Sequence, residues 1–204
     1  MSAIILGGGR SSRLGQDKVS LIINGESILP RTISRLNEVS SDIIIVKASG
    51  DNQRSQTISP EVRIVTDFES SKGPLMGIYT GMKASHDDYC LVVACDMPFL
   101  NIDLLYYMTS RIPGYDAVVP FIKDEVEPLH AVYSTDCIDI IEQMIQQNDL
   151  KVRNLLGQIR VRYIGQDEID HYDPDHLSWF NINTPDDLKR AGEIMKREKT
   201  NDRS

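Results

Sequence analysis

Short apolar runs alternate with segments of helical period along the 204 residues of the chain. Continuous aliphatic or β-branched runs predict buried strands, and apolar residues at three- and four-residue spacing predict helices. The predicted strands cover 4–6, 43–46, 62–65, 91–94, 117–119, 129–133 and 161–164. The predicted helices cover 27–39, 73–85, 101–111, 137–145, a short stretch near 155, and 184–198.

The order of these elements determines the expected fold class. Near-continuous apolar strands that alternate with helices are typical of a parallel sheet covered on both faces. We therefore expect an α/β fold with a mostly parallel, Rossmann-like sheet. Residues 1–198 are expected to form one domain, and residues 199–204 a charged, frayed tail. Ligands of such sheets bind beyond the carboxyl ends of the strands, so the segments that follow 4–6 and 91–94 are expected to meet.

Composition narrows the possible partners. The net charge of −8 argues against a broad basic surface for nucleic acid. No apolar run approaches the roughly 20 residues of a membrane span, and Met1–Leu6 is too short for a signal peptide. The three cysteines form an odd set, two of them in apolar, strand-like surroundings. This pattern predicts buried thiols in a reducing compartment, with the cytoplasm as the expected location.

A loop rich in glycine and basic residues follows the first strand. It contains Gly7, Gly8, Gly9, Ser11, Ser12, Arg13 and Lys18. Glycines after a strand bring backbone N–H groups close to a ligand, and the hydroxyls and cationic side chains suit a triphosphate. The spacing matches neither a P-loop nor a dinucleotide fingerprint. The alternative is a glycine loop whose basic residues are merely solvated, but the combination at a strand end favours anion binding.

The second candidate is Asp96, which follows the most apolar predicted strand. Such a strand does not tolerate an unpaired charge, so we expect Asp96 just beyond the sheet, at its solvent edge. A carboxylate there suits Mg²⁺, which prefers oxygen ligands and often bridges to phosphates. Pro98 stiffens the turn. Considered alone, an isolated Asp before a helix is more commonly a turn residue that hydrogen-bonds nearby backbone, and the metal role is favoured only when the glycine-rich loop and the family resemblance are added.

The segment from Leu6 to Lys18 resembles the Leu-x-Gly-Gly-x-Ser-x-Arg-Met-Gly-x-x-Lys signature of the molybdenum cofactor guanylyltransferases. Gly7 replaces a usual Ala, and Leu14 a usual Met, without removing a ligand group. Three further stretches are similar to family motifs: 73–78 to Gly-Pro-Leu-Ala-Gly, 96–98 to Asp-x-Pro, and 181–186 to Asn-x-Asn-Thr-Pro. Four motifs in order over residues 6–187 make the resemblance specific.

The resemblance implies a fold of the nucleotide-diphospho-sugar transferase type and an enzyme that transfers GMP from GTP to molybdopterin. It places Arg13 and Lys18 on the phosphates and makes Asp96 the ligand of Mg²⁺. Leu6, Gly7, Gly8, Gly9, Ser11, Ser12, Gly73 and Pro74 are implied on the nucleotide side. Molybdenum-molybdopterin is an equally open acceptor, and other proteins of cofactor biosynthesis or cofactor-accepting proteins are implied partners.

Two positions bear on base choice within the resemblance. Gly8 stands where cytidylyl-transferring relatives carry Ala, and the missing methyl group leaves room for a purine. Asp67 falls where the family has an acid that recognises guanine, and a carboxylate accepts from both N1–H and the exocyclic amine. A solvated loop acid is its alternative. Asn181 and Asn183 are candidates for the acceptor side, although turn formation and helix capping fit them equally well.

Two other functions remain open on the sequence. One is a nucleotidyltransferase of the same fold that uses CTP or another acceptor, and the other is a nucleotide sensor without turnover. The histidine and cysteine spacings argue against structural zinc. Cys95 is interpreted as a packed side chain rather than a nucleophile, and His130 as a strand residue that can face the acceptor pocket.

Overall fold

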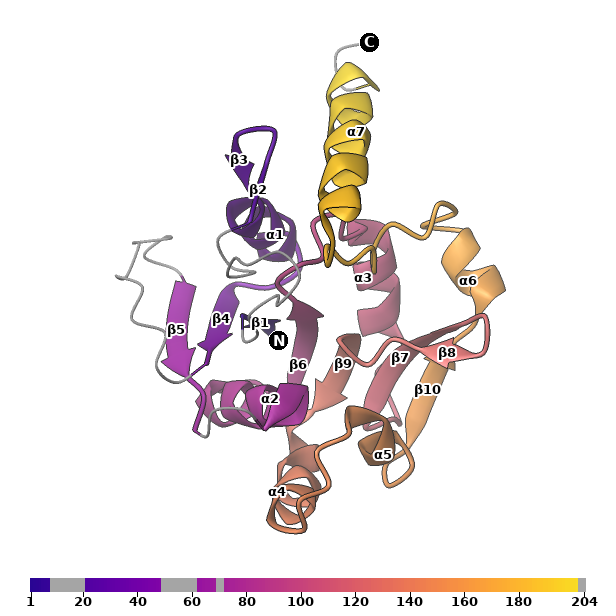
Figure 1. Cartoon of the computed structure of the whole chain (residues 1–204). Coiled ribbons are helices and arrows are strands. Elements are labelled where there is room, and N and C mark those ends of the chain that lie inside the picture. Colours follow the sequence, from indigo (N-terminus) through magenta and orange to yellow (C-terminus); the bar gives the residue numbers. More distant parts are fainter. Residues whose placement is uncertain (8–20, 49–61, 69–71, 202–204) are drawn as a thin grey trace.

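An eight-stranded sheet forms the centre of the computed structural model, which describes residues 1–7, 21–48, 62–68 and 72–201. Its strand order is β10-β7-β9-β6-β1-β4-β5, with β8 paired to β7 (Figure 1). The strands are β1 (Ser2–Leu6), β4 (Asp42–Lys47), β5 (Val62–Thr66), β6 (Tyr89–Ala94), β7 (Ala117–Ile122), β8 (Glu125–Val126), β9 (His130–Ser134) and β10 (Val161–Ile164).

All the long pairings are parallel except those of β9. Strands β5, β4, β1 and β6 pair in parallel, as do β7 and β10, whereas β9 pairs antiparallel with both β6 and β7. Because β9 is antiparallel to both of its neighbours, β7 and β10 run in the same direction as β6. The expected mostly parallel sheet is confirmed, and the carboxyl ends of six strands meet at one edge.

Helices cover both faces of the sheet. They are α1 (Ile28–Asn37), α2 (Gly73–Ala84), α3 (Ile102–Ser110), α4 (Ile138–Gln146), α5 (Val152–Leu156), α6 (Gln166–Asp170) and α7 (Pro185–Asn201), with a 3-10 turn at Thr135–Cys137. Apolar residues of α1, α3 and α6 pack on one face, and those of α2, α4 and α5 on the other. None of the helices in the described ranges is both long enough and apolar enough to cross a bilayer.

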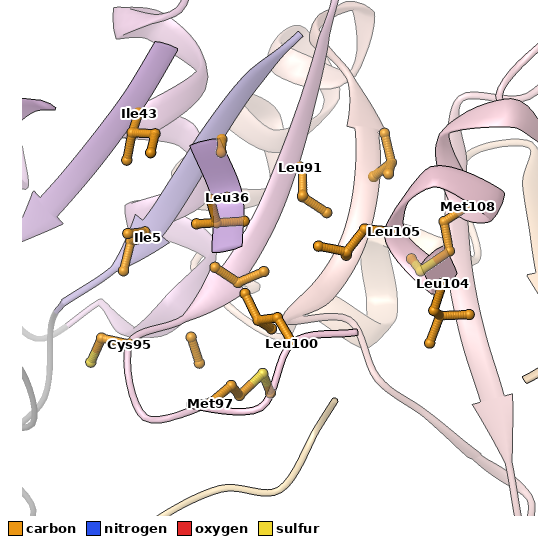
Figure 2. Packing of buried hydrophobic residues seen from close by; sticks show 14 of the residues in the cluster. Ile5, Leu36, Ile43, Leu91, Cys95, Met97, Leu100, Leu104, Leu105 and Met108 are labelled. Atoms are coloured by element: carbon orange, nitrogen blue, oxygen red, sulfur yellow. The ribbon is translucent and has the colours of Figure 1, made fainter. Parts of the chain in front are cut away.

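The first of these layers shows why the apolar runs are buried. Ile5 of β1, Ile43 of β4 and Leu91 of β6 point to the same face, where Leu36 of α1 and Leu105 of α3 meet them (Figure 2). Alternate residues of the same strands enter the second layer, so each parallel strand is apolar on both sides. This double burial fixes the strands whose ends carry the candidate site.

A third, smaller cluster lies outside the two layers. The hairpin of β2 (Ile22–Ile23) and β3 (Glu26–Ser27) packs against α7, which stands beside it at the top of Figure 1. The cluster is made of Leu21, Ile23, Ile28, Phe99, Ile182, Ala191 and Met195. The Asn24 side chain also donates to the Gly192 carbonyl at 2.9 Å. The chain that follows the glycine-rich segment is therefore held by the C-terminal helix.

The main elements lie where the sequence predicts them, with three additions. The β2–β3 hairpin, β8 and α6 were not expected, and each consists of two- or five-residue elements. Helix α7 continues to Asn201, into the segment expected to be a tail. The single domain over residues 1–198 stays a prediction, and the polar stretch 49–59 lies outside the described residues.

Candidate active site

The strand register aligns the candidate acids on one row of the sheet. Leu6 of β1 is paired with Val46 of β4 and with Ala94 of β6, and Val46 is paired with Val65 of β5. Asp96 follows Ala94 by two residues, and Asp67 follows Val65 by two. The two carboxylates therefore start from equivalent positions beyond the same edge, three interstrand spacings or about 14 Å apart.

The turn that carries Asp96 is anchored by three backbone contacts. The Cys95 N–H donates to the Leu6 carbonyl at 3.2 Å, and the Asp96 carbonyl accepts from the Ile182 N–H at 3.1 Å. The Arg31 guanidinium donates through Nε to the Pro98 carbonyl at 2.9 Å. Contacts from β1, from the segment before α7 and from α1 thus converge on four consecutive residues. Such support fixes the backbone of the turn that carries the Asp96 carboxylate.

Asp96 lies beyond the end of β6, as predicted, but the expected solvent-edge position was wrong. Its side chain is only 3% exposed. Cys95 and Met97 on either side are also buried, in the first layer (Figure 2). Burial of a carboxylate costs free energy unless hydrogen bonds or a cation compensate its charge.

The oxygen chemistry of this turn fits Mg²⁺. Among the described residues no group of three or more His, Cys, Asp and Glu side chains could hold a metal ion. Mg²⁺ does not require such a group, because it is commonly bound by one or two carboxylates together with waters and substrate phosphates. Asp96, as a single buried carboxylate at the carboxyl edge, matches that kind of site.

Asp67 is positioned by two neighbouring elements. Its N–H donates to the Lys47 carbonyl of β4 at 2.8 Å, and its Oδ1 accepts from the Thr80 hydroxyl of α2 at 2.8 Å. Burial raises the pKa of the Asp67 carboxyl, while the hydrogen bonds from Thr80 and the Phe68 N–H act in the opposite direction. Asp67 is thus a partly buried acid with a fixed side chain rather than a freely solvated loop residue.

Gly73 and Pro74 open α2, as the sequence predicts. Gly73 has a φ of +71°, a conformation that L-residues with side chains rarely adopt. Pro74 occupies the first turn, where its missing N–H costs no helical hydrogen bond. The helix start lies after Asp67 along the chain, with residues 69–71 between them outside the described part. Its direct contact with nucleotide stays a prediction.

Asn181 and Asn183 flank the residue that contacts the Asp96 turn. The Asn181 side chain donates to the Trp179 carbonyl at 2.9 Å. The Asn183 N–H donates to the Asp187 carboxylate at 3.0 Å, and the Thr184 hydroxyl accepts from the Asp187 N–H at 3.2 Å. These contacts confirm the predicted helix start at Thr184–Pro185. The Ile182 N–H between the two asparagines is what joins this segment to the Asp96 turn.

The phosphate-binding candidates divide between described and undescribed parts of the chain. Leu6 ends β1 and is 8% exposed, and the Gly7 N–H donates to the Val46 carbonyl at 2.8 Å. The remaining loop candidates lie outside the described residues; they are Gly8, Gly9, Ser11, Ser12, Arg13 and Lys18. The chain enters this loop at the same edge that carries Asp96.

His130 and the cysteines belong to the packed interior. His130 is a strand residue of β9, as predicted, and is fully buried with its ring edge-on to Trp179 at 6.0 Å. Burial lowers its pKa to about 4, and the Asp173 charge pulls in the opposite direction. All three cysteines lie in the described part of the chain, where they are buried and form no disulfide. Burial raises the pKa of Cys90 to about 11, and Cys95 is packed against the first layer.

Sequence reasoning did not find the residues that support these acids. Thr80 contacts Asp67 from another element, and the Arg31 side chain and the Ile182 N–H both donate to backbone carbonyls of the Asp96 turn. Backbone contacts leave no signature in residue type. A hydroxyl within the apolar face of α2 was the one available signal, because a buried Thr needs a partner.

Comparison with known proteins agrees with this architecture. Residues 3–163 match the model of the MobA-like NTP transferase domain. A probable molybdenum cofactor guanylyltransferase of Pelotomaculum thermopropionicum is 35% identical over 199 residues, which cover 98% of this chain and 95% of the relative. The molybdenum cofactor guanylyltransferase of Desulfosudis oleivorans is 31% identical over 198 residues, covering 96% of each chain.

Solved structures give the same result. The crystal structure of molybdopterin-guanine dinucleotide biosynthesis protein A from Archaeoglobus fulgidus aligns with a TM-score of 0.81 at 30% identity, covering 97% of this chain and 100% of the other. The 4-diphosphocytidyl-2C-methyl-D-erythritol synthase of Anaerococcus prevotii shares the fold, with a TM-score of 0.69 at 15% identity over 96% of this chain and 95% of the other.

A mostly parallel sheet with acids at its carboxyl edge and this set of relatives defines a nucleotidyltransferase. The chain belongs to the MobA-like NTP transferase family, which confirms the resemblance stated from the sequence.

Proposed function

We propose that this protein transfers GMP from GTP to molybdopterin or molybdenum-molybdopterin, giving molybdopterin guanine dinucleotide and pyrophosphate. The observation that carries the proposal is the shared register of Asp67 and Asp96 at one edge of the sheet of a MobA-like chain. The acceptor is supported by the names of the relatives from Pelotomaculum and Desulfosudis and of the Archaeoglobus structure.

In this proposal the nucleotide lies along the carboxyl edge, from β5 to β6. Asp67 accepts from the N1–H and exocyclic amine of guanine at one end, and Asp96 lies at the α-phosphate end. Charge-assisted hydrogen bonds of this bidentate kind give both affinity and geometric selection. The edge between the two acids crosses the ends of β4 and β1, where Gly7 begins the loop assigned to the phosphates.

The reaction is an in-line displacement at the α-phosphorus. An oxygen of the acceptor phosphate forms a bond to that phosphorus, and the bond to the bridging oxygen of the β-phosphate breaks to release pyrophosphate. A phosphate monoester, with a second pKa of about 6, is already ionised at neutral pH and needs no general base. The protein therefore works by positioning and charge stabilisation.

Each proposed role follows from this requirement. Asp96 would hold Mg²⁺, which would supply positive charge to neutralise the phosphate oxygens. Arg13 and Lys18, outside the described residues, are assigned to the triphosphate. Asn181 and Asn183 are assigned to the acceptor side, because the Ile182 N–H between them contacts the Asp96 turn.

The deciding experiment incubates the protein with molybdopterin, Mg²⁺ and each of the four α-labelled nucleoside triphosphates. Label is expected in the dinucleotide product only from GTP, with one pyrophosphate released per transfer and no product in EDTA. Transfer from CTP instead would establish the cytidylyl alternative. Nucleotide binding without pyrophosphate release would establish a sensor.

Base choice has its own test in Gly8→Ala. A methyl group at this position is expected to weaken use of GTP more than use of CTP, because it occupies space assigned to the purine. The ratio of kcat/KM for the two nucleotides separates this effect from a general change of the loop, which lowers both alike. Equal losses for GTP and CTP would remove Gly8 from base selection.

The cellular setting belongs to the same proposal. Three buried cysteines that form no disulfide in the described part of the chain support a reducing compartment, so we assign the protein to the cytoplasm. Its product requires delivery to cofactor-dependent enzymes, which makes other proteins of cofactor biosynthesis or cofactor acceptors the expected partners. Co-purification of the tagged protein with the bound dinucleotide product tests this assignment.

A further inference from the structure

The hydroxyl of Thr80 joins α2 to the end of β5. It donates to Asp67 Oδ1 at 2.8 Å and accepts from the Phe68 N–H at 3.4 Å. Thr80 is 3% exposed, so the hydroxyl does not exchange these partners for bulk water. A buried hydroxyl with both its donor and an acceptor site used is a rigid contact.

Close packing of α2 on the sheet brings Thr80 to this position. Gly81, the next residue, has no room for a side chain, because a Cβ there would lie 2.6 Å from Ile4 Cγ2 of β1. A Cβ on Gly77, one turn earlier, would lie 3.0 Å from Leu6 Cδ2. Glycine at both positions lets the helix axis approach β1, and Thr80 then reaches the neighbouring end of β5.

The carboxylate of Asp67 is consequently fixed in two ways. Its backbone is held by the Lys47 carbonyl of β4, and the rotation of its side chain is held by the Thr80 hydroxyl. A carboxylate has about four acceptor sites, so Oδ1 can accept from Thr80 and from a ligand together. Two parallel N–H donors on a base are met only if the carboxylate plane is held within about 10–20°.

From this geometry we infer that Thr80 is a positioning residue for base selection, setting the orientation of Asp67 toward the paired N–H donors of guanine. The inference rests on the proposed function, in which Asp67 recognises the base. Thr80 itself does not contact the nucleotide. Its contribution appears as discrimination between bases that present two donors and bases that present one.

Electrostatics point in the same direction. Burial raises the pKa of Asp67, and the Thr80 hydroxyl counteracts that rise by favouring the ionised form. Only the ionised carboxylate accepts at both oxygens. The Thr80 hydroxyl thus supports both the orientation and the charge state that a bidentate contact requires.

The test compares Thr80→Val, which keeps the shape and removes the hydroxyl, with Thr80→Ser, which keeps the hydroxyl. Equilibrium dissociation constants are measured with Mg²⁺ for GTP and for ITP, whose base lacks the exocyclic amine. Thr80→Val is expected to reduce the preference for GTP over ITP by about tenfold, the effect of one lost charge-assisted hydrogen bond. Thr80→Ser is expected to retain the wild-type ratio.

A purely structural role for Thr80 predicts a different outcome. Weakened packing would lower the melting temperature and the affinity for both nucleotides alike, without changing their ratio. An unchanged ratio in folded Thr80→Val therefore overturns the inference. Should that variant fail to fold, Thr80→Ala provides the same comparison with a smaller side chain.

Asp67→Asn separates this inference from the proposed function. It is expected to abolish the preference for GTP over ITP, because an amide cannot accept at both positions. If Asp67→Asn keeps that preference, the assignment of Asp67 to guanine is wrong and the role of Thr80 falls with it. If Asp67→Asn loses the preference and Thr80→Val keeps it, only the role of Thr80 is overturned.

Discussion

The backbone N–H of Ile182 donates to the carbonyl oxygen of Asp96 at 3.1 Å, which joins the acidic turn after β6 to the segment before α7. The side chain of Ile182 is fully buried in the cluster that includes Phe99. Apolar packing of Ile182 and Phe99 therefore supports this one hydrogen bond from both segments. This bond joins the backbone between Asn181 and Asn183 to the turn that carries the carboxylate that we assign to Mg²⁺.

Asp96→Asn is expected to reduce Mg²⁺-dependent transfer by about two to three orders of magnitude while the protein stays folded. The amide is nearly isosteric but a poor ligand for Mg²⁺, and the backbone contacts of the turn do not use the side chain. Steady-state turnover and thermal melting of wild type and variant measure the two effects. Near wild-type turnover in a folded variant would contradict the metal assignment.

Asp187→Ala is expected to destabilise the protein by about 1 kcal/mol, because it removes the cap at the start of α7. The Asp187 carboxylate accepts from the N–H groups of Asn183 and Thr184 at 3.0 and 2.8 Å. Denaturant unfolding measures the loss, with Asp186→Ala as the control, since Asp186 is an exposed acid in the same turn. Equal effects of the two variants would indicate a charge effect rather than capping.

The same carboxylate has a defined pH dependence. Burial alone would raise the pKa of Asp187. Hydrogen bonds from the Asn183 N–H, from the Thr184 side chain and from the Thr184 N–H instead hold that pKa below its ordinary value. A depressed pKa contributes stability above the unfolded-state pKa of about 4, which is lost as the pH falls through the folded-state value. The difference in unfolding free energy between wild type and Asp187→Ala should therefore shrink below about pH 4.

His130→Leu is expected to flatten the loss of stability in acid. The folded-state pKa of His130 is about 4, below its ordinary value of 6.5. The unfolded chain therefore binds more protons between these values, and stability falls as the pH drops from about 6.5 to 4, by on the order of 3 kcal/mol. Below about pH 4 His130 is protonated in both the folded and the unfolded chain, so it causes no further change in stability.

At neutral pH the same variant should not be less stable, because both ring nitrogens of His130 are buried without a hydrogen-bond partner. Urea unfolding at several values between pH 4 and 8 gives the comparison. His171→Leu, at an exposed position, is the control. A wild type and a His130→Leu variant with parallel pH profiles would show that His130 does not carry the acid sensitivity.

Gly81→Ala is expected to cost about 1–3 kcal/mol of stability through overpacking. Its new Cβ would lie 2.6–3.0 Å from three side-chain atoms of Ile4, at the centre of the sheet. Gly157→Ala is the matched control, because its Cβ would make only an ordinary 3.5 Å contact and the backbone is already helical. Similar melting temperatures for the two variants would contradict close packing of α2 on β1.

Local patterns were sufficient to predict most elements of the fold. The apolar run before Asp96 can be satisfied only in a buried strand, and Asn101 caps α3 through its side chain, which accepts from the Leu104 N–H at 2.9 Å. The antiparallel direction of β9 could not be predicted, because a run of buried apolar residues does not indicate whether the strand pairs parallel or antiparallel with its neighbours. The β2–β3 turn at Asn24–Gly25 has positive φ at both residues, but two-residue strands are too short for an alternating pattern.

The candidate site was predicted at the level of single residues and not of their environment. A strand followed by Asp96 indicates where the carboxylate lies along the chain. The turn that carries it is held by contacts from Arg31 and Ile182, far away in the sequence. Thr80 likewise supports Asp67 only because α2 lies close to the sheet. These supporting contacts join residues that are distant in the sequence, so they form only in the tertiary fold.

The small cluster between the β2–β3 hairpin and α7 sets an order of events during synthesis. Leu21 and Ile23 leave the ribosome well before their packing partners Ala191 and Met195, which lie far later in the sequence. Folding that proceeds from the N-terminus therefore leaves the hairpin without support until α7 emerges. The same delay applies to the contact of Ile182 with Asp96. A nascent chain can thus assemble its sheet before the hairpin and the turn that carries Asp96 gain the contacts made by α7 and by the segment that precedes it.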